Sequence, residues 1–253
     1  NQTWVKELSF NLSTVHPLNK FNRFELYSRL RHRSFTSGIS QENVAVSPES
    51  FTPNDEQLVR FFDNSTGSNF AFGVSYVRDT VLYSNNTWGP FHGNALRAQV
   101  EGAPPLGKEF RGYASASISA RTYRHLGSSS LFAGRGDLIA TNRANGDFML
   151  FGGPDRLRGV EYGSLVCNQC AYVSAELRFP IPATYVLGTP IRGFIFSDAA
   201  YARFSDERFP AQKIGSYGFG VHYILPFIGL PAQSVWRRSN GKWNSTFYIT
   251  MNW

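Results

Sequence analysis

The chain has 253 residues, a formal net charge of +7 from 25 basic and 18 acidic side chains, and 15% aromatic residues with 23 glycines. Its mean hydropathy is −0.27, and it lacks the unbroken apolar run of ~18 residues that a spanning helix needs, which excludes a helical membrane protein. The one long uncharged stretch, Gly215 to Trp236, is interrupted by glycines and prolines. We therefore expect an aromatic-rich, all-β chain.

Strand-like alternation begins close to the first residue. In the segment Trp4–Leu12, Leu8 and Phe10 alternate with polar residues over ~9–11 positions, the length of a transmembrane β-strand. No signal peptide precedes this pattern. We expect residues 1–253 to form one barrel domain, either as a mature form or as part of a longer protein whose upstream soluble domain is absent from this chain.

A second strand is predicted from Phe21 to Arg33, with opposite chemistry on its two faces. Phe24, Leu26 and Leu30 share one face. The other face carries Arg23, Glu25, Tyr27, Arg29 and Arg31. The basic run from residue 29 to residue 33 could instead indicate nucleic-acid binding. The alternation favours a strand with apolar side chains outside and polar side chains towards a wet barrel lumen, so no nucleic-acid partner is expected.

The rest of the chain repeats this alternation after a loop at Ser34–Asp55, which has no periodicity. The further predicted strands are Gln57–Asp63, Phe70–Tyr76, Asn94–Gly102, Phe110–Tyr123, Leu131–Thr141, Tyr172–Ile181, Gly193–Ala200, Lys213–Leu225, Leu230–Arg237 and Trp243–Trp253. With the first two, these make about twelve strands. An even number predicts a closed antiparallel transmembrane β-barrel with both chain ends on one side.

The long connection before Tyr172 contains a compact loop. Its sequence, Phe151 to Val160, has a glycine pair, a proline turn and the tripeptide Leu157-Arg158-Gly159, so its backbone must fold tightly. The glycine pair is Gly152 and Gly153. The strand that follows reads Glu-Leu-Arg-Phe-Pro-Ile from Glu176.

These two motifs resemble the BamA/TamA superfamily of outer-membrane barrels, the bacterial surface antigen type. The sixth loop of that family carries a glycine pair followed by (Val/Leu)-Arg-Gly-(Phe/Tyr), and its next strand reads like Glu-Leu-Arg-Phe-Pro-Ile. Here Leu157, Arg158 and Gly159 match, whereas Val160 replaces the aromatic residue. The resemblance implies a long loop that folds into the lumen.

The resemblance also implies that the loop arginine docks against acidic groups on the next two strands. Glu176 and Asp198 match those positions, and a guanidinium inside a barrel is costly unless it is paired. We therefore expect Arg158 to form ion pairs with Glu176, Asp198 or both. The alternative is an arginine in an exposed turn and two unrelated, solvated acids.

The function implied by the resemblance is insertion or translocation of proteins at the outer membrane of a Gram-negative-type bacterium. The implied partners are outer-membrane lipids, unfolded barrel or secreted client proteins, and an upstream periplasmic domain. The alternatives are a barrel anchor or small pore for an attached domain, and a lumen-based outer-membrane hydrolase. The sequence has no Gly-x-Ser-x-Gly, HExxH or P-loop motif, so we expect no catalytic residues, metal or cofactor.

Two further features concern the loop and the end of the chain. Cys167 and Cys170 form a lone CxxC pair, which cannot complete a four-cysteine zinc site, so a small surface disulfide and two free thiols remain open. The resemblance places this pair at the foot of the long loop, on the outer side, where oxidation is permitted.

One face of the last strand resembles the terminal aromatic signal of outer-membrane barrels. It consists of Phe247, Ile249, Met251 and Trp253.

Overall fold

The protein is built entirely from β-strands in the parts that the structure describes. The computed structural model describes residues 3–37, 67–84, 89–106, 110, 112–127, 129–142, 149–151, 153, 157–158, 160, 165–186, 189–203, 211–225, 230–239 and 241–249. Nowhere in these ranges is there a helix long and apolar enough to cross a membrane.

The strands are long, and most exceed ten residues. The first seven are β1 (Thr3–Pro17), β2 (Asn22–Ser37), β3 (Gly67–Asp79), β4 (Leu82–Ser84), β5 (Gly89–Ala103), β6 (Tyr113–Leu126) and β7 (Ser130–Thr141). The others are β8 (Met149–Phe151), β9 (Leu165–Cys167), β10 (Gln169–Val186), β11 (Thr189–Arg203), β12 (Gln212–Leu225), β13 (Leu230–Ser239) and β14 (Lys242–Ile249).

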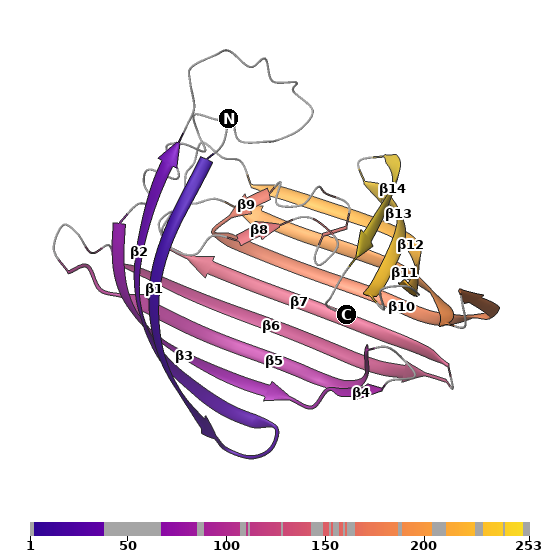
Figure 1. Ribbon diagram of the computed structural model, residues 1–253, viewed down its shortest axis with the longest axis horizontal. Coiled ribbons are helices and arrows are strands. Elements are labelled where there is room, and N and C mark those ends of the chain that lie inside the picture. Colours follow the sequence, from indigo (N-terminus) through magenta and orange to yellow (C-terminus); the bar gives the residue numbers. More distant parts are fainter. Residues whose placement is uncertain are drawn as a thin grey trace, which may run out of the picture.

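Twelve of these strands form one curved antiparallel sheet (Figure 1). Neighbours follow the order β1-β2-β3-β5-β6-β7-β10-β11-β12-β13-β14, and β4 pairs with β5 beyond the end of β3. The short strands β8 and β9 pair with each other in the long connection between β7 and β10. The sheet therefore has eleven strand positions, one of which is shared by β3 and β4.

Most strands predicted from alternation are confirmed, usually with longer bounds. The exception is Gln57–Asp63, which lies outside the described residues, as do residues 250–253 of the predicted last strand. The short strands β4, β8 and β9 were not predicted. Each has only three residues, too few to display a period of two.

Closure of the sheet is where the structure departs from the prediction. Among the described residues β1 pairs only with β2, and β14 pairs only with β13. With eleven antiparallel positions, the first and last strands run in the same direction. They cannot complete an antiparallel ring with each other, so the described sheet is open and the prediction of a closed barrel is corrected.

The two faces of the sheet have opposite chemistry. One face, called the outer face, exposes large apolar side chains on nearly every strand. Examples are Leu8, Phe10, Leu26, Phe72, Val100, Ile118, Leu138, Val173, Ile195, Phe219 and Phe247. The other, inner face buries charged and polar groups, among them Arg31, which is 2% exposed. Arg29 also points inward and donates from Nη2 to Oε1 of Glu101 at 2.6 Å. The inward orientation of Arg29 and Arg31 confirms the predicted alternation of β2.

Most of the long connections lie at one end of the sheet, and most of the short ones lie at the other. The connections at residues 38–66, 104–112, 142–168 and 204–211 join strands at one end, which we call the long-loop end. Tight connections at residues 18–21, 127–129 and 187–188 join strands at the other, the short-turn end. This asymmetry is typical of outer-membrane barrels.

Candidate functional site

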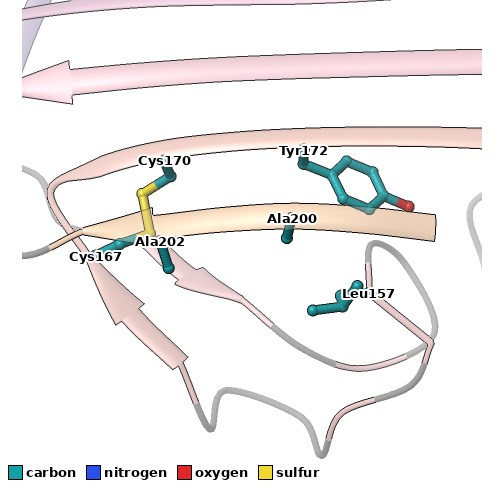
Figure 2. Packing of buried hydrophobic residues seen from close by; sticks show 6 residues of the cluster. All are labelled: Leu157, Cys167, Cys170, Tyr172, Ala200 and Ala202. Atoms are coloured by element: carbon teal, nitrogen blue, oxygen red, sulfur yellow. A yellow bond between two sulfur atoms is a disulfide. The ribbon is translucent and has the colours of Figure 1, made fainter. Parts of the chain in front are cut away.

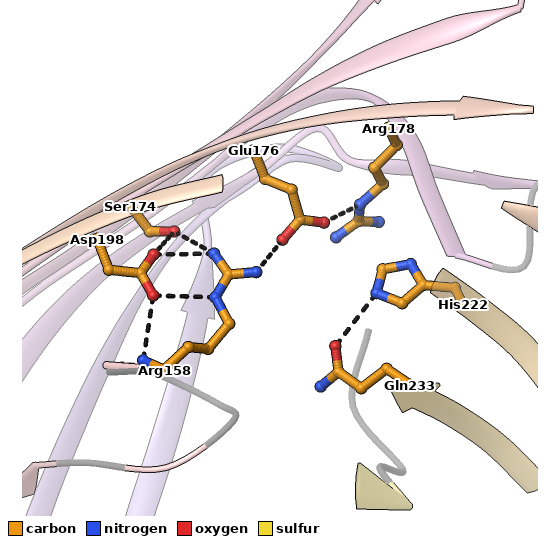
Figure 3. Close-up of polar contacts among 7 residues, drawn as sticks. All are labelled: Arg158, Ser174, Glu176, Arg178, Asp198, His222 and Gln233. Carbon is orange, nitrogen blue, oxygen red and sulfur yellow. Dashed lines mark hydrogen bonds and ion pairs between the residues drawn. The ribbon is translucent and has the colours of Figure 1, made fainter. Parts of the chain in front are cut away.

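The candidate site forms where the connection between β7 and β10 meets the inner face of β10 and β11. Ser174 on β10 lies directly opposite Asp198 on β11. Because side chains alternate along a strand, Glu176 projects to the same face as Ser174. Arg158 comes from the connection itself and reaches all three side chains (Figure 3).

Arg158 makes a forked contact with Asp198 and a second contact with Glu176. Its Nε and Nη2 donate to the two carboxylate oxygens of Asp198 at 2.9 and 2.8 Å, and its backbone N–H donates to Oδ2 at 3.1 Å. Nη1 donates to Oε2 of Glu176, and Nη2 donates to Oγ of Ser174 at 3.1 Å. Ser174 Oγ in turn donates to Oδ1 of Asp198 at 2.7 Å. Each of the three guanidinium nitrogens therefore donates to a carboxylate or hydroxyl oxygen.

This ion-pair network is buried and close to charge balance. Arg158, Glu176 and Asp198 are 5%, 8% and 2% exposed. A second cation, Arg178, donates from Nε to Oε1 of Glu176 at 2.6 Å. Burial by itself would lower the pKa of Arg158, but the two carboxylates beside it raise that pKa above its ordinary value. Two acids therefore face two arginines, which compensates the buried charges.

The guanidinium of Arg158 packs against two phenylalanine rings on β11. The Cζ atom of Arg158 lies 3.7 Å from the centroid of the Phe196 ring and 5.8 Å from that of Phe194. A cation over a desolvated aromatic face is stabilised by up to ~2 kcal/mol. Both rings share the inner face of β11 with Asp198, because side chains alternate along a strand, and Phe194 and Phe196 are 0% and 5% exposed.

Glycines on β12 make room for these rings. Gly218 pairs with Phe196, and Gly220 pairs with Phe194. A Cβ on Gly218 would lie 3.0 Å from the Phe196 ring and 2.1 Å from a backbone oxygen of β13, and a Cβ on Gly220 would lie 2.4 Å from the Phe194 ring. Glycine is therefore required for the rings to lie against the sheet.

An apolar cluster fixes the loop beside the ion pairs. Leu157 is fully buried together with the Cys167–Cys170 disulfide, Tyr172 and two alanines of β11 (Figure 2). The spacing of the cysteines had left a disulfide and free thiols open, and the structure shows the disulfide. Its sulfur atoms are buried under the loop, not on the surface as expected.

The loop backbone is tight, as its glycines predict. Gly153 has a φ of 96°, in the left-handed region, and its N–H donates to the carbonyl of Val160 at 3.0 Å. Val160 packs against the Leu157 cluster, so an apolar side chain occupies the position where the resembled family has an aromatic ring. Gly152 and Gly159 lie outside the described residues.

A neighbouring polar pair was not predicted. His222 on β12 faces Gln233 on β13, with Nε2 and Oε1 3.2 Å apart, and its ring stacks on Phe194 with centroids 4.2 Å apart. Alternation along β12 would have placed His222 on the inner face, but its partners depend on strand register.

Within the described ranges, no group of three or more His, Cys, Asp or Glu side chains could hold a metal ion.

The end of the chain is described only in part. Phe247 and Ile249 lie on one face of β14 and are 49% and 51% exposed. Met251 and Trp253, the other members of the predicted terminal signal, lie outside the described residues.

Comparison with known proteins assigns the family. The profile of the Omp85 superfamily domain matches residues 1–236. The chain belongs to the Omp85 superfamily. This membership confirms the resemblance found in the loop and strand motifs. No curated protein sequence matches this Omp85 chain.

Solved structures share the Omp85 fold at low sequence identity. BamA from Haemophilus ducreyi lacking POTRA domains 1–3 matches with a TM-score of 0.70 and 15% identity, over 97% of this chain and 53% of that one. CdiB from Acinetobacter baumannii matches with a TM-score of 0.62 and 15% identity, over 96% of this chain and 41% of that one. The Omp85 chain thus spans about half the length of these relatives.

Proposed function

We propose that the protein forms the membrane-embedded sheet of an outer-membrane barrel that inserts or translocates other proteins. The observation that carries this proposal is the buried contact of Arg158 with Glu176 and Asp198, within a sheet whose outer face is apolar. Membership of the Omp85 superfamily and the likeness to BamA and CdiB support the same conclusion.

The outer face supports a location in the membrane. Its exposed leucines, phenylalanines, valines and isoleucines would be a liability in water, whereas lipid chains solvate them. The inner face keeps its charges paired and away from lipid. Outer-membrane lipids are therefore the first partner of this protein.

Closure would require strands beyond the eleven positions of the sheet. An unpaired strand edge leaves N–H and C=O groups without partners, which the hydrocarbon of a bilayer does not tolerate. Because β1 and β14 run in the same direction, an odd number of additional antiparallel strands completes the ring.

The number of strands also determines which strands would meet where the ring closes, a junction that we call the seam. Pairing Trp4–Leu12 directly with Trp243–Trp253 would require parallel strands, so the strand next to β14 at the seam is one of the additional strands. A client strand that pairs along β14 would add to the sheet by β-augmentation. The Arg158 network holds the loop against β10 and β11, close to this edge of the sheet.

The test is insertion of a urea-unfolded small outer-membrane barrel into liposomes, with and without the protein. We expect faster insertion with the wild-type protein and a large loss with Arg158→Ala. The control variant is Arg97→Ala, which removes a half-exposed ion pair with Glu25 on the same inner face. Stable single-channel conductance without faster insertion would overturn the proposal and favour a small pore.

A further inference from the structure

The last four strands have an unusual charge distribution. Among the residues of β11, β12, β13 and β14, the only acidic one is Asp198, which binds Arg158 on the inner face. The outer face of these strands carries three exposed cations, Arg203, Lys213 and Arg238. All three lie at or near the long-loop end of their strands.

Two of these cations are close neighbours. Lys213 pairs with Tyr201, and Arg203 lies two residues further along β11 on the same face. Diagonal neighbours of this kind lie ~7–8 Å apart, and like charges so placed repel. In the described part of the chain no carboxylate offsets either charge on this face.

The third cation is held by aromatic residues. Arg238 lies directly between Tyr217 and Trp243 in the strand register, and its Nη1 donates to the Tyr217 hydroxyl at 3.3 Å. The rings of Tyr217 and Trp243 meet edge to face with centroids 6.2 Å apart. Both rings are about half exposed. This contact aligns the guanidinium but leaves its other donors available.

The apolar belt begins next to Tyr217 and Arg238. The next outward positions towards the short-turn end are Phe219 on β12 and Trp236 on β13, and these two rings stack with centroids 5.6 Å apart. Tyr and Trp concentrate where a membrane meets water, and Arg and Lys side chains extend from there to the headgroups. Arg238, Tyr217 and Trp243 therefore lie at headgroup level, and Lys213, Arg203 and Tyr201 lie further towards the long-loop end. We call these six residues the basic-aromatic rim.

We propose that the basic-aromatic rim binds the phosphates of anionic lipid headgroups in the leaflet around the long-loop end. Arg238 presents a fork that suits one phosphate. Lys213 lies four residues further along β12 than the partner of Arg238, and it forms a second basic position together with Arg203. A lipid fits better than a soluble acidic partner, because its chains cover the apolar belt that begins at Phe219 and Trp236. This inference rests on the proposed location in the membrane.

The experiment is native mass spectrometry of the protein released from nanodiscs that contain equal amounts of phosphatidylcholine and phosphatidylglycerol. The wild-type protein should retain the anionic lipid in clear excess. The variant Arg203→Gln/Lys213→Gln/Arg238→Gln should lower that excess by roughly tenfold or more. The matched control removes three exposed cations at the short-turn end, as Lys20→Gln/Arg78→Gln/Arg124→Gln, and should keep the preference.

Each of the following outcomes would contradict lipid binding by the basic-aromatic rim. Equal losses in the two triple variants would mean general attraction by net charge. A wild-type protein without a preference for phosphatidylglycerol would overturn the proposal. A retained second copy of the chain in place of lipid would identify a protein interface. Failure to enter neutral phosphatidylcholine nanodiscs would instead overturn the proposed membrane location.

Discussion

Replacement of Arg158 by alanine should release the loop from the inner face. Glu176 would keep Arg178 as a partner, whereas Asp198 would keep only Ser174 and a backbone N–H. Removing one partner of a buried ion pair costs ~3–5 kcal/mol, because the other charge stays buried and uncompensated. Most of this cost should come from Asp198. Loop opening should therefore become roughly 10²-fold to 10⁴-fold more frequent.

Native-state hydrogen exchange of β9 and β10 in detergent, together with limited proteolysis of residues 142–168, measures this opening. Arg97→Ala is the control, because its partly exposed pair with Glu25 is worth only ~0–1 kcal/mol. It should leave the loop protected.

A double-mutant cycle tests the cause of the effect. Arg158→Ala and Asp198→Ala should be strongly non-additive, since the second change removes the charge that the first leaves unpaired. Arg158→Ala and Glu176→Ala should couple more weakly, because Arg178 also binds Glu176. Additive losses with both acids, or the reverse order of coupling, would refute the buried ion-pair network.

Three further changes test other parts of the molecule. Cys167→Ala/Cys170→Ala opens a disulfide of sequence separation 3 and should cost ~2 kcal/mol; unchanged exchange in β9 would contradict this. Gly220→Ala places a Cβ 2.4 Å from a phenylalanine ring and from a backbone oxygen of β13, and should cost ~1–3 kcal/mol in thermal stability. Gly215→Ala, whose nearest atom is 3.9 Å away, should be nearly neutral. Deletion of Trp253 should reduce assembly of heat-modifiable barrel in membranes, and normal assembly would count against the terminal signal.

The strands could be predicted because their signal is local. Along β2, for example, the exposed Leu26 and Leu30 alternate with inward Arg29 and Arg31, and a period of two needs no knowledge of neighbouring strands. Closure could not be predicted in this way. It depends on the exact number of strands, and alternation cannot show that Leu82–Ser84 shares a position with β3.

Part of the site could be predicted from the sequence, and part of it could not. The family resemblance identified Arg158, Glu176 and Asp198 as a set, and the structure brings them together. The rings of Phe194 and Phe196 were missed, because their role depends on pairing with glycines of the next strand. Glycines at alternate positions of a predicted strand, opposite aromatics of its neighbour, are the signal that could have found them.

The inverted polarity of the sheet has a calorimetric consequence. In the described part of the chain, the buried apolar residues form four small clusters of three to six members, while the larger apolar side chains face outward. When such a sheet unfolds within a detergent micelle, those outward side chains can keep their apolar surroundings. The heat capacity change of unfolding should then fall well below the ~12–15 cal/mol/K per residue of water-soluble domains. The curve of stability against temperature would be correspondingly flat, and cold would destabilise this fold much less than it destabilises a domain with a large internal core.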